Sequence, residues 1–273
     1  MFKELLETVR MRKPLIHNIT NYVTVNDCAN VLLACGGSPI MADDAEEVEE
    51  ITAICDGLNI NIGTLSRQRI PSMFLAGKKA NALGHPVVLD PVGAGACTLR
   101  TETALKLLDE VKFSAIRGNI SEIKALAFGK GKTNGVDADL ADTVTADNLE
   151  QAVEFAKRFA ERTGAVVAIT GAIDIVTDGQ QAYCIYNGHP AMARITGAGC
   201  QLSALTAAYI TANPETVLAA TAAAVCSMGL CGEKAWQRMT ALDGNASYRN
   251  YLIDAICNLT GEELEQGAKF ELR

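Results

Sequence analysis

Residues 85–119, HPVVLDPVGAGACTLRTETALKLLDEVKFSAIRGN, contain the pattern that decides the fold. Two short apolar runs, 85–90 and 113–117, flank the helix-like segment 101–111. Each run is followed by glycine and polar residues, which are typical of a loop. Short apolar strands separated by helices are characteristic of a parallel sheet that is covered on both faces. This stretch therefore predicts a strand–helix–strand unit of an α/β protein.

The same alternation continues on both sides of this unit. Further strand-like runs are LNINI (58–62) and AVVAIT (165–170), and further helix-like runs are 67–84 and 147–164. Asp178-Gly179 lies between two β-like runs and predicts a hairpin turn. The chain is then alanine-rich and helical from about residue 200 to 257. We predict one α/β domain over residues 1–273, with three layers, a mostly parallel central sheet and helices on both faces.

One segment departs from this alternation. Residues 129–144, GKGKTNGVDADLADTV, are rich in glycine and acidic residues and lack a clear period. A loop of this length within a compact domain is commonly functional or mobile. We expect it to lie on the surface.

Composition narrows the class of protein. The 273 residues are 49% hydrophobic and 21% charged, with a formal net charge of -8, which argues against a broad nucleic-acid surface. We expect no apolar run long enough to span a bilayer, and the N-terminus lacks the apolar core of a signal peptide. The nine cysteines are scattered without zinc-type spacing, as expected for free thiols in a reducing cytoplasm. A cytoplasmic protein without nucleic-acid or membrane partners is predicted.

The sequence Thr196-Gly197-Ala198-Gly199-Cys200 leads directly into the apolar run 201–210. Glycine permits the positive φ angles of a tight turn, and the first N–H groups of a helix have no intrahelical partner. Together with the helix dipole they form an anion site that suits phosphate. The Lys-Ser/Thr of a Walker A loop and a GxGxxG dinucleotide motif are both missing. A tight turn without a ligand is the structural alternative.

Cys200 is the unusual residue of this turn. A thiol at a helix N-terminus is expected to have a lowered pKa. It could act as a general base toward a hydroxyl, hold that hydroxyl in place, or act as a nucleophile, which would require a partner base. It could also be a small residue chosen for packing. The residues alone leave these roles open.

Other polar residues follow predicted strands, where ligands of open α/β sheets gather. Asp90 could face a metal or close a turn, and Arg117 could bind phosphate or a carboxylate. Asn119 and Glu122 are one helical turn apart, so they could hold a hydrated Mg²⁺ or form a capping box. Thr170 could bind phosphate or end the sheet. We also expect residues 191–195, AMARI, to form a short strand before the glycine turn.

Two residues near the N-terminus suit an organic ligand. Met41 follows a short strand and offers a soft wall for a flat heteroaromatic ring, although methionine is usually a core residue. Asn21 could contact the same ligand or cap the helix that follows.

Taken together, the motifs resemble the hydroxyethylthiazole kinase family, which has a ribokinase-like fold. The resemblance spans the chain through ITN (19–21), SPIMA (38–42), NIGTL (61–65), DPVGAGA (90–96), RGNISE (117–122), AITG (168–171) and TGAGC (196–200). It implies transfer of the ATP γ-phosphate to the hydroxyl of 4-methyl-5-(2-hydroxyethyl)thiazole in thiamine biosynthesis and salvage.

The resemblance also implies a role for each matched residue. Met41 and Gly197 would contact the thiazole alcohol, with Asn21 against its ring. Arg117, Thr170 and Asn119 would bind ATP, and Asp90 and Glu122 would support Mg²⁺. The turn formed by Gly197, Ala198, Gly199 and Cys200 would stabilise the transferring phosphoryl group, with Cys200 at the base position. The family is expected to form homotrimers with sites at the subunit interfaces.

Two alternatives remain at this point. The chain could be a ribokinase-like kinase for another vitamin-precursor alcohol, or a non-catalytic metabolite-binding protein on the same scaffold.

Overall fold

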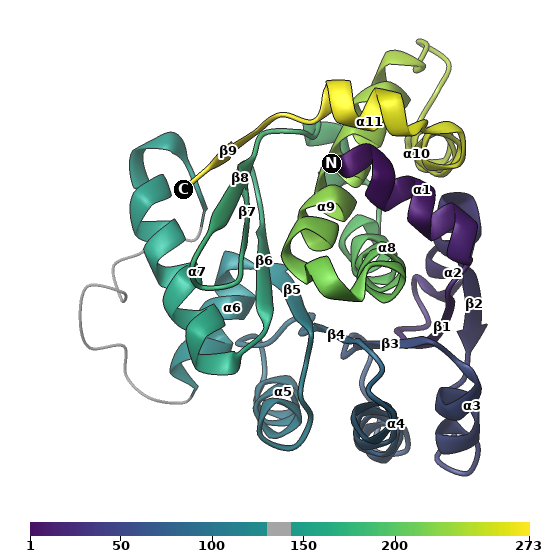
Figure 1. Cartoon of the computed structure of the whole chain (residues 1–273), viewed down its shortest axis with the longest axis vertical. Coiled ribbons are helices and arrows are strands. Elements are labelled where there is room, and N and C mark those ends of the chain that lie inside the picture. Colours follow the sequence, from purple (N-terminus) through teal and green to yellow (C-terminus); the bar gives the residue numbers. More distant parts are fainter. Residues whose placement is uncertain (130–142) are drawn as a thin grey trace.

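The computed structural model describes residues 1–129 and 143–273. One nine-stranded sheet runs through the middle of the molecule (Figure 1). The strands are β1 (Leu15–Ile19), β2 (Ser38–Met41), β3 (Gly57–Asn61), β4 (Val87–Asp90), β5 (Ala115–Asn119), β6 (Val166–Thr170), β7 (Asp174–Thr177), β8 (Ala182–Ile185) and β9 (Phe270–Leu272). Their order in the sheet is β2-β1-β3-β4-β5-β6-β7-β8-β9. The strands from β2 to β6 pair in parallel, and β7, β8 and β9 add antiparallel pairs.

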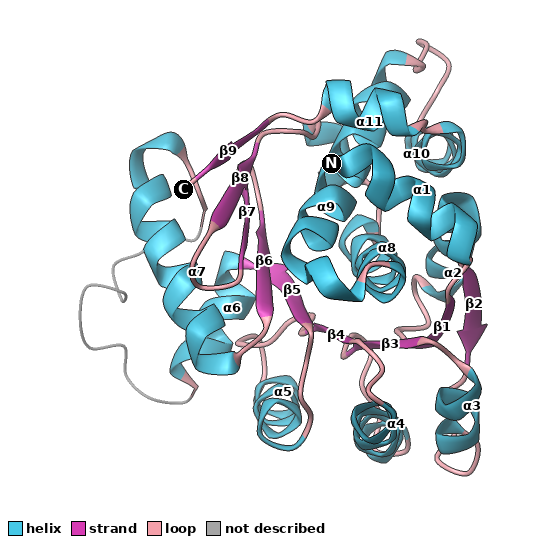
Figure 2. Ribbon diagram, viewed as in Figure 1, coloured by secondary structure: helices cyan, strands magenta, loops and turns pink. Residues whose placement is uncertain are grey.

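Helices cover both faces of this sheet (Figure 2). The α-helices are α1 (Phe2–Arg12), α2 (Val25–Cys35), α3 (Val48–Ile54), α4 (Arg69–Leu83), α5 (Thr98–Glu110), α6 (Ile120–Phe128), α7 (Leu149–Thr163), α8 (Ala198–Ala212), α9 (Val217–Gln237), α10 (Asn245–Asn258) and α11 (Gly261–Gly267). The 3₁₀ helices are η2 (Ala146–Asn148), η3 (Pro190–Arg194) and η4 (Pro214–Thr216). Helices α3 to α7 lie on one face, and α1, α2 and α8 to α11 lie on the other (Figures 1 and 2).

Each face of the sheet packs on its own hydrophobic cluster. Helix α7 illustrates how the sequence produces this arrangement. Its buried residues recur at helical spacing, Leu149, Ala152, Val153, Ala156, Phe159 and Ala160 among them, so one stripe faces the sheet. The helix ends at Gly164, whose φ of 69° is the left-handed conformation that glycine adopts without strain. The predicted three-layer α/β fold is thereby confirmed.

Three elements differ from the sequence-based expectation, and the first is strand β1 over Leu15–Ile19, where no strand was predicted. Residues 191–195 do not form a strand: Pro190 stands at the start of η3, where its fixed φ favours a helical turn, and the His189 side chain accepts a hydrogen bond from the Ala191 N–H. Strand β9 was not predicted, because three residues carry too little pattern to be recognised. Of the loop predicted at 129–144, residues 130–142 lie outside the part that the structure describes.

Helix α9 corrects the expectation about membrane-length segments. Together with η4, Pro214–Gln237 has the length and apolar composition needed to cross a membrane. However, 72% of the apolar stretch of this helix is buried inside the fold, where α9 packs on α8 and α10. Its apolar character is therefore accounted for by its place in the core.

Candidate active site

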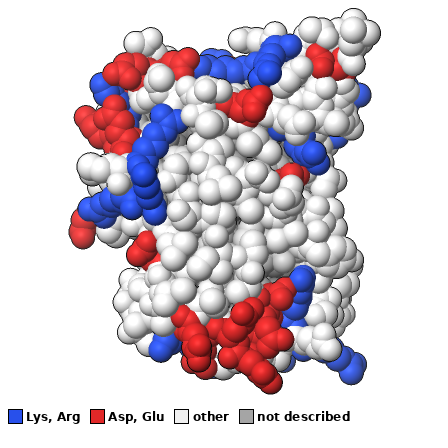
Figure 3. Space-filling model, turned by 90° about the vertical axis from the view of Figure 1, so that its right-hand side faces the viewer, with Lys and Arg blue, Asp and Glu red and all other residues white. Residues whose placement is uncertain are grey.

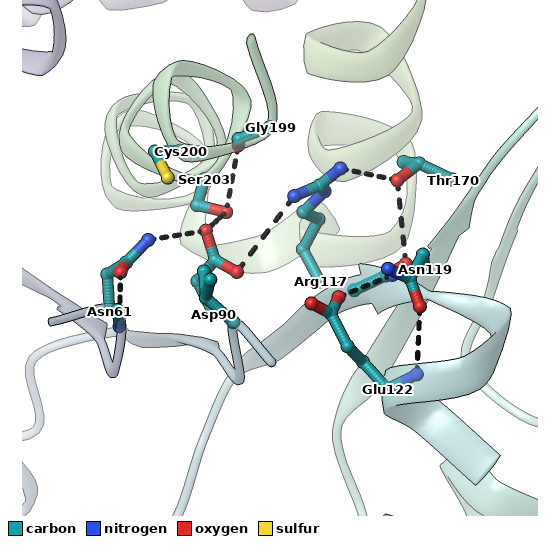
Figure 4. A network of polar contacts seen from close by, with 12 residues as sticks. Asn61, Asp90, Arg117, Asn119, Glu122, Thr170, Gly199, Cys200 and Ser203 are labelled. Atoms are coloured by element: carbon teal, nitrogen blue, oxygen red, sulfur yellow. Dashed lines mark hydrogen bonds and ion pairs between the residues drawn. The ribbon is translucent and has the colours of Figure 1, made fainter. Parts of the chain in front are cut away.

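The carboxyl ends of the parallel strands meet at one edge of the sheet, and polar side chains gather there. In register, Asn61 of β3 stands beside Asp90 of β4, and Asn119 of β5 stands beside Thr170 of β6. The N-terminus of α8 lies above these ends and carries Gly199, Cys200 and Ser203 (Figure 4). Met41 ends β2 at the same edge, but two positions farther along the sheet than β3.

The first turn of α8 needs glycine at two positions. Gly197 has a φ of +86°, and a Cβ there would lie 2.4 Å from Thr24 Cγ2. A Cβ at Gly199 would lie 2.3 Å from Arg117 Nη1. No side chain caps this helix, so its first N–H groups remain directed at the space before it. The turn predicted from the sequence thus begins a helix whose N-terminus is open to a ligand.

Arg117 extends from β5 beneath this helix terminus (Figure 4). Its Nη2 donates to Thr170 Oγ1, its Nη1 lies 3.9 Å from Asp90 Oδ1, and its Nε has no hydrogen-bond partner. The side chain is only 12% exposed. A guanidinium beside the positive end of a helix dipole is unfavourable unless negative charge lies close to both. The arrangement is therefore suited to an anion that accepts from both groups.

Asp90 is the most buried carboxylate of the site, with no exposed surface. Its Oδ2 accepts from Asn61 Nδ2 at 2.7 Å and from Ser203 Oγ at 2.8 Å, whereas Oδ1 has no hydrogen-bond partner. Burial raises the pKa of Asp90 to about 6, and the charge of Arg117 opposes this shift. An unpaired oxygen on a buried carboxylate is a group that a cation would stabilise.

Asn119 and Glu122 form the capping box that the sequence allowed as one alternative. Asn119 Oδ1 accepts from the Glu122 N–H at 2.8 Å, and Glu122 Oε2 accepts from the Asn119 N–H at 2.8 Å. Glu122 Oε1 also accepts from the Gly93 N–H at 2.8 Å, which ties α6 to the loop after β4. Each carboxylate oxygen can still accept another hydrogen bond, for example from a water of a hydrated cation. The capping role does not exclude the metal role.

Cys200 is buried at the third position of α8 and is 8% exposed. Its Sγ accepts a hydrogen bond from Asn21 Nδ2 at 3.2 Å. Burial raises the pKa of the thiol above its ordinary value, and the nearby charge of Asp90 adds to this effect. The lowered pKa expected for this thiol is therefore wrong, because burial and a neighbouring carboxylate both raise it.

Three further polar residues take part in the site but were not singled out from the sequence. Asn61 and Ser203 hold Asp90, and Asp174 accepts from the Gly171 N–H at 2.8 Å after β6. Burial raises the pKa of Asp174 to about 7, with Arg117 opposing. Asn61 begins a motif quoted above, and Ser203 lies one turn after Cys200, so position alone could have indicated both.

Comparison with known proteins adds the family. A family model described as the hydroxyethylthiazole kinase family matches residues 6–262. The chain belongs to the hydroxyethylthiazole kinase family. A hydroxyethylthiazole kinase of Clostridium acetobutylicum is 64% identical over 271 residues, which cover 99% of either chain.

Solved structures agree with this membership. The hydroxyethylthiazole kinase protein from Pyrococcus horikoshii OT3 is 37% identical, with a TM-score of 0.88 and coverage of 100% of this chain and 98% of that one. A pyridoxal kinase from Staphylococcus aureus is 16% identical with a TM-score of 0.61, covering 95% of this chain and 98% of that one, and it shares the fold alone. The predicted family and its ribokinase-like fold are confirmed.

Proposed function

We propose that this member of the hydroxyethylthiazole kinase family transfers the γ-phosphoryl group of ATP to the hydroxyl of 4-methyl-5-(2-hydroxyethyl)thiazole, in thiamine biosynthesis and salvage. The observation that carries the proposal is the uncapped N-terminus of α8, which faces Arg117 and Asp90 across one site. Phosphoryl transfer depends mainly on positioning and on stabilising charge, and this site offers both. The acceptor alcohol is inferred from the names of the relatives, which are hydroxyethylthiazole kinases.

ATP would lie along the ends of β5 and β6. Arg117 offers a planar set of donors whose Nε is unpaired, and Thr170 already orients that guanidinium. Asn119 is exposed and its Nδ2 is not used by the capping box, so it remains a donor toward the nucleotide. The N–H groups of Ala198, Gly199 and Cys200 would meet the transferring phosphoryl group, as in an oxyanion hole.

Mg²⁺ would be held by Asp90 and Glu122. The fit rests on Asp90 Oδ1, which is buried and has no hydrogen-bond partner among the described residues beyond its 3.9 Å ion pair with Arg117, and on a carboxylate at Glu122 that faces the same loop. Among the described residues, no group of three or more His, Cys, Asp or Glu side chains is close enough to enclose a metal. Two carboxylates with several waters is the coordination that Mg²⁺ favours beside phosphates, where it would offset their charge.

The alcohol would lie between Cys200 and the β1–α2 connection. Asn21 donates to Cys200 Sγ, and this hydrogen bond would stabilise negative charge on the sulfur as it receives the hydroxyl proton. A weak base is sufficient where the hydroxyl proton leaves late in a loose transition state. Gly197 and Met41 would complete the pocket of the thiazole.

We further propose a cytoplasmic homotrimer with sites at its subunit interfaces, each chain folding as one domain. Figure 3 shows a broad central area without charged side chains, bordered by charged residues, on the side of the molecule where Figure 1 places α2, β2 and α10. Leu33 of α2 is 60% exposed, and Tyr22 and Val23 before it are 68% and 56% exposed. β2 is the edge strand of the sheet and ends at Met41. An apolar face beside an open strand edge is typical of an interface. Light scattering would give three times the mass of the chain.

The deciding experiment is an ADP-release assay with the purified chain, ATP and the thiazole alcohol, with and without Mg²⁺. We expect turnover that requires both the alcohol and Mg²⁺. Pyridoxal and a hydroxymethylpyrimidine serve as competing alcohols. Faster turnover of either would assign another acceptor, and binding of the thiazole without ADP release would indicate a non-catalytic protein.

A further inference from the structure

Cys200 and Asp90 are joined by a chain of side-chain hydrogen bonds that the backbone of α8 closes into a ring. Asn21 Nδ2 donates to Cys200 Sγ at 3.2 Å and to Asn61 Oδ1 at 3.1 Å. Asn61 Nδ2 donates to Asp90 Oδ2 at 2.7 Å, and Ser203 Oγ donates to the same oxygen at 2.8 Å. Since Ser203 follows Cys200 by one turn of α8, the ring begins and ends on that helix. Figure 4 shows its part through Asn61, Asp90 and Ser203.

The orientation of the Asn61 amide is fixed by its neighbours. Its Oδ1 accepts from the Gly63 N–H at 2.9 Å, and a backbone N–H can only donate. Its Nδ2 faces a carboxylate, which accepts. Both contacts require the same orientation, and the side chain is completely buried. The usual ambiguity between the oxygen and nitrogen of an amide therefore does not arise here.

This orientation determines what Cys200 meets. Because Asn61 presents an oxygen to Asn21, the Asn21 side chain must turn its Nδ2 inward, and the same Nδ2 reaches the sulfur. Thr24 Oγ1 donates to Asn21 Oδ1 at 3.1 Å and holds the other end of that amide. The sulfur thus receives a donor, which favours negative charge on it and leaves its proton free to point elsewhere.

The ring also depends on close packing at Gly63. A Cβ there would lie 2.9 Å from Asn21 Nδ2 and 3.0 Å from Asn61 Oδ1. Any side chain at this position would push the two amides apart. The short β3–α4 connection thus allows the contact that joins the two halves of the ring.

We propose that Asn61 is a positioning residue that sets the hydrogen-bond polarity at Cys200 through Asn21, while fixing Asp90 with its other end. Its importance for catalysis rests on the proposed function, in which the sulfur receives the hydroxyl proton. The effect of Asn61 on the Cys200 thiol does not depend on the proposed function, and it can be measured without substrate.

The primary test measures the rate at which iodoacetamide alkylates Cys200 as a function of pH, by mass spectrometry of its peptide. The exposed Cys97 is the internal reference. We expect Asn61→Ala, which removes the oxygen that orients Asn21, to raise the midpoint of the Cys200 curve by roughly one pH unit. Asn61→Leu, which has a similar shape but no polar atoms and no charge, should shift the midpoint in the same direction, and it serves as the second variant if the cavity left by Asn61→Ala prevents folding. If a variant only made Cys200 more accessible to iodoacetamide, the alkylation rate at high pH would change but the midpoint of the curve would not.

Asn59→Ala is the matched control, because Asn59 is equally buried on the same strand but donates to Asn18 Oδ1 and not to the ring. A double-mutant cycle of Asn61→Ala with Asn21→Ala separates the two routes by which Asn61 could act. If it acts through Asn21, the double variant should shift the Cys200 midpoint no further than Asn21→Ala alone. Additive shifts, or an unchanged midpoint in both Asn61 variants, would overturn the proposal.

Steady-state kinetics then connect the ring to catalysis. Asn61→Ala should lower kcat about tenfold, less than the roughly 10²- to 10⁴-fold of a whole general-base contribution, and leave the KM for ATP unchanged. A shifted thiol midpoint in a chain that shows no thiazole kinase activity would refute the proposed function and leave the role of Asn61 intact. A normal kcat together with a shifted midpoint would show that the ring does not serve catalysis.

Discussion

The two helices that begin beside the site, α6 and α8, start in opposite ways. The N-terminus of α6 is closed by the reciprocal capping box of Asn119 and Glu122. The N-terminus of α8 has Gly197 and no side-chain cap. Both helices begin at the same edge of the sheet, and each has a positive dipole end there. Only α8 keeps its first N–H groups available to a ligand. A capped terminus supports the site, whereas an uncapped one can bind an anion.

Closing the terminus of α8 should have the largest effect. In Gly199→Ala the new methyl group would lie where Arg117 Nη1 now packs, so the guanidinium must move away from the helix terminus. We expect kcat/KM to fall by roughly 10² to 10³, the range seen when one oxyanion donor is lost. Alanine is favourable within a helix, so the melting temperature should not fall. Gly244→Ala, where no atom lies within 4 Å, is the control. Retained activity in Gly199→Ala would refute the close-approach argument.

Removing the cation opposite that terminus should come next. Arg117→Ala eliminates the donors that face the proposed phosphates and frees Thr170 Oγ1. Hydrogen bonds to charged groups contribute about 1.5–3 kcal/mol, so the KM for ATP should rise roughly 10- to 100-fold. Isothermal titration with a non-hydrolysable ATP analogue checks binding directly. An unchanged affinity would remove Arg117 from the nucleotide site.

Replacing the thiol at the N-terminus of α8 should, unlike the two substitutions above, not lower the rate. In Cys200→Asp a carboxylate would accept from Asn21 Nδ2 in place of the sulfur and would provide a stronger base. We expect kcat to stay the same or to rise several-fold. If the variant folds and binds both substrates but is inactive, position 200 is not the base position.

Two substitutions of Asn119 separate its role as the cap of α6 from its proposed contact with ATP. Asn119→Ala removes the cap and should cost about 1 kcal/mol, or a fall of about 2–4 °C in melting temperature. Asn119→Ser keeps a capping oxygen without adding a charge and loses the Nδ2 donor, so it tests for a contact between that amide and ATP. Calorimetry and the KM for ATP separate the two roles. If Asn119→Ala changed neither the melting temperature nor the KM for ATP, both the capping role and the nucleotide role would be contradicted.

Asp174, beside Arg117, should give the stability of the fold a pH dependence. Burial raises its pKa to about 7 in the folded chain, against about 3.9 for an unfolded aspartate. The folded state therefore binds the proton more tightly, and this contribution, complete below about pH 4, is lost as the pH rises through about 7. Asp174→Asn should be more stable than the wild type at pH 8 and close to it at pH 4. A melting-temperature difference that does not change with pH would refute this.

Much of the fold could be predicted because its signals are local. The apolar runs at 85–90, 113–117 and 165–170 each became a strand, and Asp178-Gly179 lies between β7 and β8. Residues 191–195 failed because an alternating pattern competed with Pro190, whose fixed φ favours a turn. β9 could not be predicted because it depends on pairing with β8, far away in sequence.

The gathering of polar residues at one edge of the sheet could be predicted, but their contacts could not. Residues 90, 117, 119 and 170 lie at the ends of strands, so sequence order alone placed them at one edge. The pKa direction of Cys200 was not predictable, because burial and the distance to Asp90 appear only after folding. For the same reason, Asn61 looked like an ordinary strand residue until its amide could be seen between Asn21 and Asp90.

Helix α8 packs on β1, β3 and β4, where a buried polar stripe of Asn59, Asn61 and Asp90 lies on the sheet. Its contacts join residues that are far apart along the chain: Ser203 is 113 positions from Asp90, and Cys200 is 179 positions from Asn21. Contacts of such separation form late in folding, because the intervening chain must first be ordered. Until α8 docks, this stripe would stay in contact with water. We therefore expect refolding chains to recover alkylation protection at Cys200 together with activity, in the last kinetic phase.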